Sequence, residues 1–184
     1  ISPNGDTVAI DTDICAGCGA CAVVCPSGAA SYDDPPVAML FTRLRILAAA
    51  FRAAGGTAPR VLFHESDWGA ELIRLAARFG DGLPADVIPV EVSTLESVGH
   101  AEIMAAIGVG FASVNLLLGP RTDRAVIETE AAFARALAGD IPVNLIDINE
   151  PDGLCDTLYD AAPSAPLEKP ILPMDKPGRE CEVR

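Results

Sequence analysis

Residues 114–148 read VNLLLGPRTDRAVIETEAAFARALAGDIPVNLIDI and contain the pattern that decides the fold. An apolar run over 114–118 is followed by a stretch, 122–138, whose apolar residues recur with helical spacing up to Gly139, and a second apolar run covers 143–148. Short apolar runs on either side of an amphipathic helix indicate a right-handed strand–helix–strand crossover. The stretch therefore predicts two strands of one parallel sheet.

The same alternation continues toward the N-terminus. Strand candidates lie at 61–63 and 87–92, and helical patterns cover 72–79 and 96–107. Strands that alternate with helices predict an α/β fold, and we expect a flavodoxin-like, four-stranded parallel sheet in the order 2-1-3-4 with helices on both faces. Pro89 lies inside the second strand and cannot donate a ladder hydrogen bond, so this strand is expected at an edge, where the order places it.

Proline and glycine divide the rest of the chain. An amphipathic pattern over 37–54 begins after two prolines and ends before two glycines, and a last short helix is expected near 152–160. Beyond it the tail contains five prolines, too many for regular structure. We divide the chain into a small loop-rich segment, a connecting helix, an α/β domain and a Pro-rich linker or tail, at residues 1–36, 37–57, 58–160 and 161–184.

Composition excludes several classes of protein. The chain of 184 residues has 13 basic and 26 acidic side chains, a net charge of -13, which argues against nucleic-acid binding because phosphates require clustered Lys and Arg. No uncharged apolar run is long enough to predict a membrane span. The first residues have no features of a secretion signal, so a cytoplasmic location is expected. Because residue 1 is Ile, we interpret the chain as a fragment of a longer protein.

The most specific motif is CxxCxxCxxxCP, formed by Cys15, Cys18, Cys21 and Cys25 with the proline that follows. Thiolates at this spacing on a tight, glycine-containing loop can converge on one cuboidal cluster. A zinc site would instead need two separated pairs of ligands, and four inert core cysteines at this spacing are improbable. The motif therefore predicts a 4Fe-4S cluster as the cofactor, with these four cysteines as its metal ligands.

With this motif, residues 7–32 resemble the bacterial 4Fe-4S ferredoxins, including the lead-in Ile10-Asp11-Thr12-Asp13 and the Gly28-Ala29 after the last cysteine. In two-cluster ferredoxins the first three cysteines bind one cluster and the fourth reaches the other. This chain has one copy of the motif, so the resemblance leaves open whether Cys25 completes the same cluster or serves a second one. Cys155 and Cys181 are the remaining candidates, but we interpret the first as a small buried residue and the second as a free thiol.

Two predicted strand ends, 64–68 and 119–124, flank the crevice where sheets of this order bind ligands. Arg121 and Arg124 are suited to an anion, although a helix start capped by Thr122 or Asp123 explains the same residues. A strand-end histidine such as His64 is more often structural than catalytic. Because no glycine-rich phosphate loop follows the first strand, neither FMN nor NAD is expected.

The α/β region, residues 59–150, resembles the iron-sulfur delta subunits of methyl-viologen-reducing hydrogenases. The resemblance rests on the strand order, on Trp68 after the first strand and on the Leu118-Gly119 strand end. Where that family has cysteines, this chain has the residues His64, Glu65, Ser66, Asp67 and Pro120. The resemblance therefore implies a docking domain without its own redox centre.

These observations favour an iron-sulfur electron-transfer protein. In this hypothesis a ferredoxin-like segment of a larger multi-cluster redox protein passes electrons between oxidoreductase partners, and its acidic surface steers basic redox protein partners. The alternative is an assembly or ligand-binding α/β module with a structural or regulatory cluster. Whether the protein is an enzyme is left open, because no pairing of a nucleophile with a base is evident in the sequence.

Overall fold

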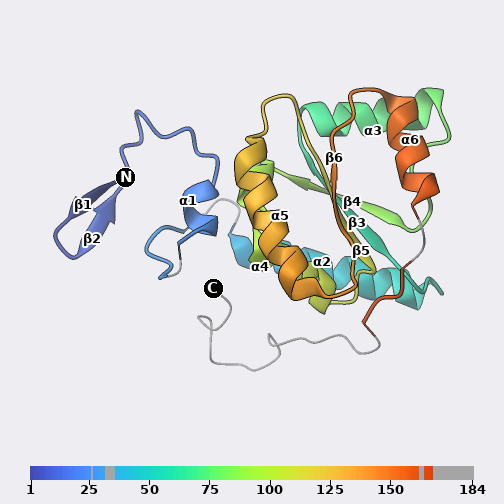
Figure 1. The fold of residues 1–184 in the computed structure, drawn as a ribbon, viewed down its shortest axis with the longest axis horizontal. Coiled ribbons are helices and arrows are strands. Elements are labelled where there is room, and N and C mark those ends of the chain that lie inside the picture. The colour runs from blue at the N-terminus through green and yellow to red at the C-terminus, as the bar shows by residue number, and fades with distance from the viewer. Residues whose placement is uncertain (26, 32–35, 162–163, 168–184) are drawn as a thin grey trace.

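The central element is a four-stranded parallel sheet in the order β4-β3-β5-β6 (Figure 1). The computed structural model describes residues 1–25, 27–31, 36–161 and 164–167. The strands of this sheet are β3 (Arg60–Glu65), β4 (Val87–Val92), β5 (Ser113–Leu117) and β6 (Val143–Ile146). Counted along the chain, their spatial order is 2-1-3-4, which confirms the predicted α/β fold and its topology.

Pro89 lies in the edge strand, as expected. It is paired in register with Leu62 of β3, and β4 has no neighbour on its other side within the described sheet. The burial of β4 alternates accordingly, because Val90 and Val92 face the core while Pro89 and Glu91 are exposed. A proline that cannot donate to a ladder is tolerated at such an edge.

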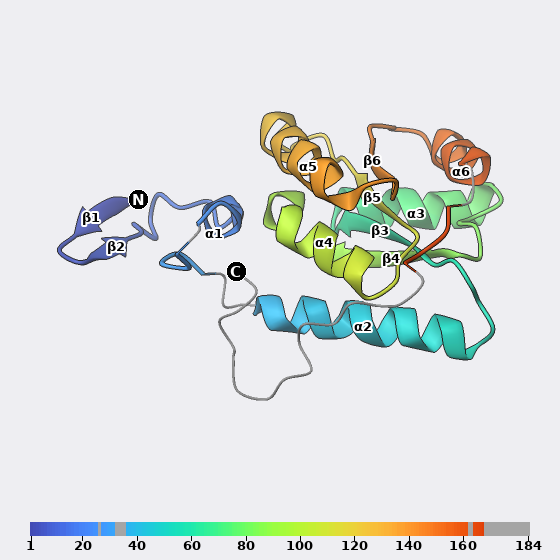
Figure 2. The ribbon, with the colours of Figure 1, turned by 60° about the horizontal axis from the view of Figure 1, so that its bottom comes forward.

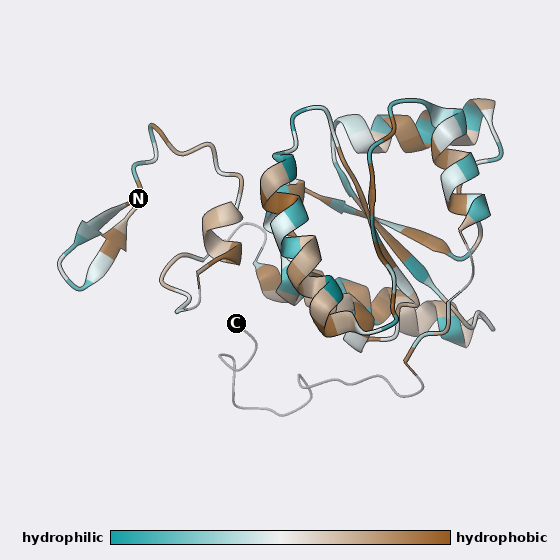
Figure 3. Cartoon of the chain, in the orientation of Figure 1, coloured by the Kyte–Doolittle hydropathy of each residue, from teal (hydrophilic) through white to brown (hydrophobic). Residues whose placement is uncertain are grey.

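Helices cover both faces of the sheet (Figure 2). Along β3, Val61 and Phe63 enter the larger hydrophobic core, whereas Leu62 enters a second core on the opposite face. This alternation follows from the two-residue period of a strand, and a sheet buried on both faces is what parallel strands require. Figure 3 shows hydrophobic residues along the strands and hydrophilic ones mixed into the surrounding helices. The larger core is covered by α2 (Val37–Ala53), α4 (His100–Gly108) and α5 (Arg124–Ala138), and the second by α3 (Trp68–Phe79) and α6 (Pro151–Asp160).

The helix predicted as a connector, α2, packs as a member of this layer. Leu44 and Ala48 are completely buried in the larger core. At the other end of the helix, the Arg52 guanidinium donates hydrogen bonds to the carbonyl oxygens of Val109 and Gly110, at 3.0 and 3.5 Å. One face of α2 thus contributes to the core of the α/β unit.

The N-terminal segment contains an antiparallel hairpin of β1 (Ser2–Asn4) and β2 (Thr7–Ala9), joined at Gly5, whose φ of 62° suits glycine. The stretch Thr7-Val8-Ala9-Ile10 indicates the second strand in the sequence, whereas no such pattern marks the first. The short helix α1 (Ala20–Val23) follows inside the cysteine motif. This segment extends away from the sheet, with α1 as the part nearest to the α/β unit (Figure 1).

The described part of the tail contacts the α/β unit. The Ser164 hydroxyl donates to the carbonyl oxygen of Ala112 at 2.6 Å, and Leu167 packs against the larger core. The rest of the predicted Pro-rich tail, from residue 168 on, lies outside the described residues. In the described part of the chain, no helix has both the length and the apolar character needed to cross a membrane.

Candidate metal centre

Tight turns shape the cysteine loop. The amide of Cys15 donates to the carbonyl oxygen of Asp11 at 2.9 Å, and the Asp11 carboxylate accepts from the amide of Asp13 at 3.0 Å. Gly17 and Gly19 then adopt φ values of 69° and 78°, a left-handed conformation that a side chain would oppose. The two glycines therefore let the backbone wrap around the cysteines, as the motif predicted.

Backbone amides and one hydroxyl surround two of the sulfur atoms. The Gly17 amide donates to Cys15 Sγ at 3.4 Å, and the Ala30 amide donates to Cys25 Sγ at 3.5 Å. The Ser27 hydroxyl lies 3.5 Å from the same Cys25 sulfur. Hydrogen bonds from Ser27 and then from Ala30 stabilise the thiolate and lower the pKa of Cys25 to about 7. A thiolate is the form that binds iron.

The four cysteines offer a suitable donor set on an open loop. Cys15 and Cys21 are exposed, and Cys18 and Cys25 are partly buried. Over residues 1–25, 27–31, 36–161 and 164–167, no three His, Cys, Asp or Glu side chains converge closely enough to hold a metal ion. Four thiols, two of which have amide donors at their sulfur atoms, fit the chemistry of a 4Fe-4S cluster.

Comparison with known families identifies this segment. Residues 7–30 match a family model described as a 4Fe-4S binding domain. The chain contains a ferredoxin-type domain. Its cofactor is a 4Fe-4S cluster, and all four cysteines of the motif lie within the match. No curated protein matches the chain. The likeness of the α/β unit to hydrogenase delta subunits has no support in these comparisons and stays a prediction.

Cys155 lies far from the ferredoxin-type domain. It is on α6, on the opposite side of the α/β unit from α1 in both ribbon views (Figures 1 and 2). Its side chain is 5% exposed and belongs to the second core. The prediction of a small buried residue at this position is confirmed. Cys181, the other candidate outside the motif, lies outside the described residues.

The crevice residues have structural partners within the chain. His64 is buried, its Nδ1 lies 3.0 Å from the carbonyl oxygen of Glu65, and burial lowers its pKa, which favours the neutral imidazole. Asp123 caps α5 by accepting from the amides of Ala125 and Val126. Capping, one of the two interpretations of this helix start, is therefore what the structure shows.

Both arginines at this helix start face carboxylates. Arg124 makes a two-pronged contact with Asp147 at 3.0 and 2.7 Å, which lowers the pKa of Asp147. Arg121 contacts Asp67 at 3.3 Å on the surface. Their charges are thus offset within the chain, and an anion site is not favoured here.

Sequence reasoning missed the loop after β4, which we call the η1 loop (residues 93–99). It contains the short 3-10 helix η1 (Leu95–Ser97) and touches the ferredoxin-type domain, because the Thr94 hydroxyl donates to the carbonyl oxygen of Cys18 at 2.6 Å. The predicted parallel sheet already indicates where this loop lies. Because β4 and β5 both run parallel to β3, the loop after β4 lies at the same edge as the other two strand ends.

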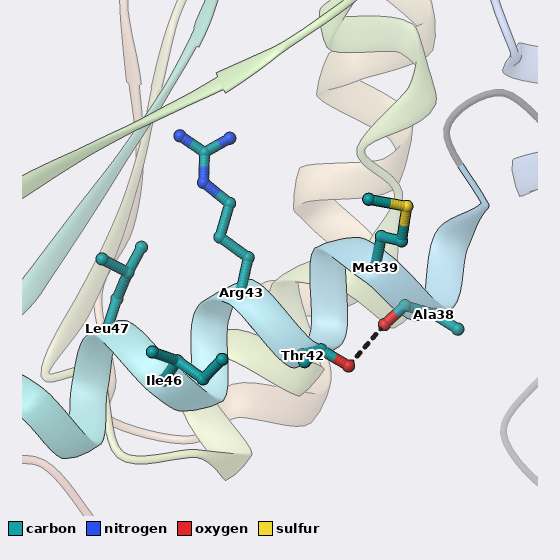
Figure 4. A pocket seen from close by; sticks show the side chains of 6 residues that line it. All are labelled: Ala38, Met39, Thr42, Arg43, Ile46 and Leu47. Atoms are coloured by element: carbon teal, nitrogen blue, oxygen red, sulfur yellow. Dashed lines mark hydrogen bonds between the residues drawn. The ribbon is translucent and has the colours of Figure 1, made fainter.

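A surface hollow runs along the outer side of α2 (Figure 4). Its two polar side chains already have partners, since the Thr42 hydroxyl donates to the Ala38 carbonyl oxygen and Arg43 donates to that of Glu91. The other lining residues are apolar and include no cysteine. This hollow is therefore not a second metal centre.

Proposed function

We propose that this protein is an iron-sulfur electron-transfer protein. Its ferredoxin-type domain passes single electrons between oxidoreductase partners, as one segment of a larger multi-cluster redox protein. The observation that carries the proposal is the uninterrupted CxxCxxCxxxCP motif inside the 4Fe-4S family match. When bound, the cluster supplies the one-electron chemistry, and the chain supplies ligands, hydrogen bonds and a surface for partners.

Cys15, Cys18, Cys21 and Cys25 are the proposed ligands. The amides of Gly17 and Ala30 donate toward two of these sulfur atoms and offset the negative charge of the thiolates. Such hydrogen bonds favour the more negative, reduced state of a cluster and so raise its reduction potential. The proposal allows two roles for Cys25: it binds the same cluster as the first three cysteines, or it binds a second cluster.

Exposure and charge suit a protein that exchanges electrons with others. Cys15 and Cys21 are exposed, so a cluster held there lies near the surface and close to a docked partner. The net charge of -13 favours fast association with partners that present a basic face. A cytoplasmic location is proposed because thiol ligands of this kind persist in a reducing compartment.

A second candidate is a structural or regulatory cluster attached to an assembly or ligand-binding α/β module. The contact between Thr94 and Cys18 favours it, since it links the cysteine loop directly to the sheet edge. Reversible reduction separates the two candidates. Anaerobically reconstituted protein should accept one electron per cluster from dithionite and return it to an oxidant, followed by visible absorption and electron paramagnetic resonance. A cluster that forms fully but cannot be reduced and reoxidised would rule out electron transfer.

A further inference from the structure

Among the described residues, two contacts between the cysteine loop and the α/β unit involve residues of the η1 loop. At the first, the Thr94 hydroxyl donates to the backbone carbonyl oxygen of Cys18 at 2.6 Å, across 76 positions of sequence. Thr94 is partly buried, so this hydrogen bond is shielded from competition with bulk water. The bond therefore holds the backbone of a proposed ligand, and it does not involve the sulfur atom of that residue.

At the second point, α1 packs against the start of α4. A Cβ atom added at Gly99 would lie 2.1 Å from Cγ1 of Val23 and 3.0 Å from Oε2 of Glu130. The φ of Gly99 is -97°, which any residue can adopt, so glycine is needed here for space and not for backbone conformation. Val23 lies between two motif cysteines, and its side chain fills the space that Gly99 leaves.

The η1 loop that presents Thr94 is itself firmly held. Leu95 and Val98 are completely buried in the larger core. The Glu96 carboxylate accepts from the amide of Asp123 at 2.7 Å, and the Ser97 hydroxyl donates to the carbonyl oxygen of Thr94 at 2.7 Å. A donor fixed by buried side chains and by the start of α5 can hold a loop in place at little entropic cost.

We propose that the η1 loop at the carboxyl edge of the sheet is a docking platform for the cysteine loop, with Thr94 and Gly99 as positioning residues for the cluster. In sheets of this type that edge usually takes a ligand. Here the chain's own cysteine loop lies against part of it. The retention and reduction potential of the cluster then depend on a loop whose Thr94 lies 76 positions along the chain from Cys18. This inference rests on the cluster and not on electron transfer, so it holds even if the cluster is purely structural.

Variants of Thr94 test the first contact. Thr94→Val removes the hydroxyl but keeps the shape, and anaerobic holoprotein carrying it should lose iron to a chelator about five-fold faster, the effect of one hydrogen bond. Thr94→Ser restores the donor and should return the rate to within about two-fold of the original. Thr129→Val is the matched control, because its hydroxyl donates to Ala125 on α5 at 2.8 Å, away from the cysteine loop. Of these three variants, only Thr94→Val should change the reduction potential of the cluster.

Equal rates of iron loss in Thr94→Val and Thr129→Val, with equal potentials, would overturn the role of Thr94. The second contact is tested by Gly99→Ala, which should push Val23 away and speed iron loss. Adding Val23→Ala removes the contact of 2.1 Å with Cγ1, the shortest of those made by the new Cβ atom, and should slow the loss again. Additive effects of these two changes would overturn the role of Gly99. If Gly99→Ala fails to fold, as thermal unfolding of the apoprotein would show, the Thr94 variants decide the proposal alone.

Discussion

The sulfur atom of Cys155 lies 3.4 Å from the carbonyl oxygen of Gly82, which fastens α6 to the loop after α3. The contact gives Cys155 a structural role inside the second core, remote from the cysteine loop. A cysteine in this position contributes packing and a weak hydrogen bond, and it is not poised to bind iron.

Cys18→Ser removes a proposed ligand, so anaerobically reconstituted protein with this change should lose most of its iron and acid-labile sulfide. Cys155→Ser should keep both at the original level and cost only about 1–2 kcal/mol of stability, since it places a hydroxyl in an apolar core. Iron, sulfide and thermal unfolding are measured on both variants. Equal loss of iron would show that Cys155 is a ligand after all.

Isolation in air should yield protein with little iron. Cys15 and Cys21 are exposed, so oxygen reaches a cluster held by this loop, and an incomplete ligand set would increase the loss. The measurement compares iron per chain after aerobic and anaerobic purification. A fully loaded, air-stable cluster held by all four motif cysteines would contradict the hypothesis that the motif is split between two clusters.

Alkylation of the apoprotein should report the pKa of Cys25, which is lowered to about 7 by the Ser27 hydroxyl and the Ala30 amide. Because iodoacetamide reacts with the thiolate, labelling of Cys25 should reach half of its maximal rate near pH 7. Ser27→Ala removes the main donor to the thiolate and should move the midpoint to higher pH. Peptide mass spectrometry over a pH series resolves each cysteine, and an unchanged midpoint in Ser27→Ala would contradict this account.

Periodicity predicted the sheet well because burial on both faces leaves continuous apolar runs, and Pro89 marked the edge strand. The first strand of the hairpin was missed because its three residues are all exposed and leave no apolar pattern. The first residue of β3, Arg60, was not predicted as part of the strand, because it is charged although it is buried. It is buried at the start of β3, where a charge breaks the pattern, and it is held by Asp86 at 2.6 Å.

The candidate site also has one part that the sequence predicts, the cysteine motif, and one that it does not, the contact with Thr94. Ligand spacing is local, so the cysteine motif and its glycines were recognisable from the sequence alone. The contact of Thr94 with Cys18 joins residues 76 positions apart, and a threonine after a strand carries no distinctive signal. Contacts of this kind depend on how two segments pack, and one sequence without its fold does not specify that packing.

Packing of α2 leads to the last prediction, that the α/β folding unit begins at residue 37 and not at 58. Leu44 is fully buried in the larger core, so Leu44→Ala should destabilise the protein by about 2–5 kcal/mol through lost burial and a cavity. Met39 is on the same helix with 60% of its surface exposed, and Met39→Ala should change stability by less than about 1 kcal/mol.

Urea unfolding followed by circular dichroism measures both variants. The test is completed by two fragments, one beginning at residue 37 and one at 58, both ending at 167, the last described residue. Without α2 the second fragment exposes the face of the larger core that Leu44 and Ala48 cover, and it loses the Arg52 contacts with the end of α4. It should therefore unfold at lower urea concentration or fail to fold. Equal stability of the two fragments would show that α2 is a connector, as its sequence pattern alone suggested.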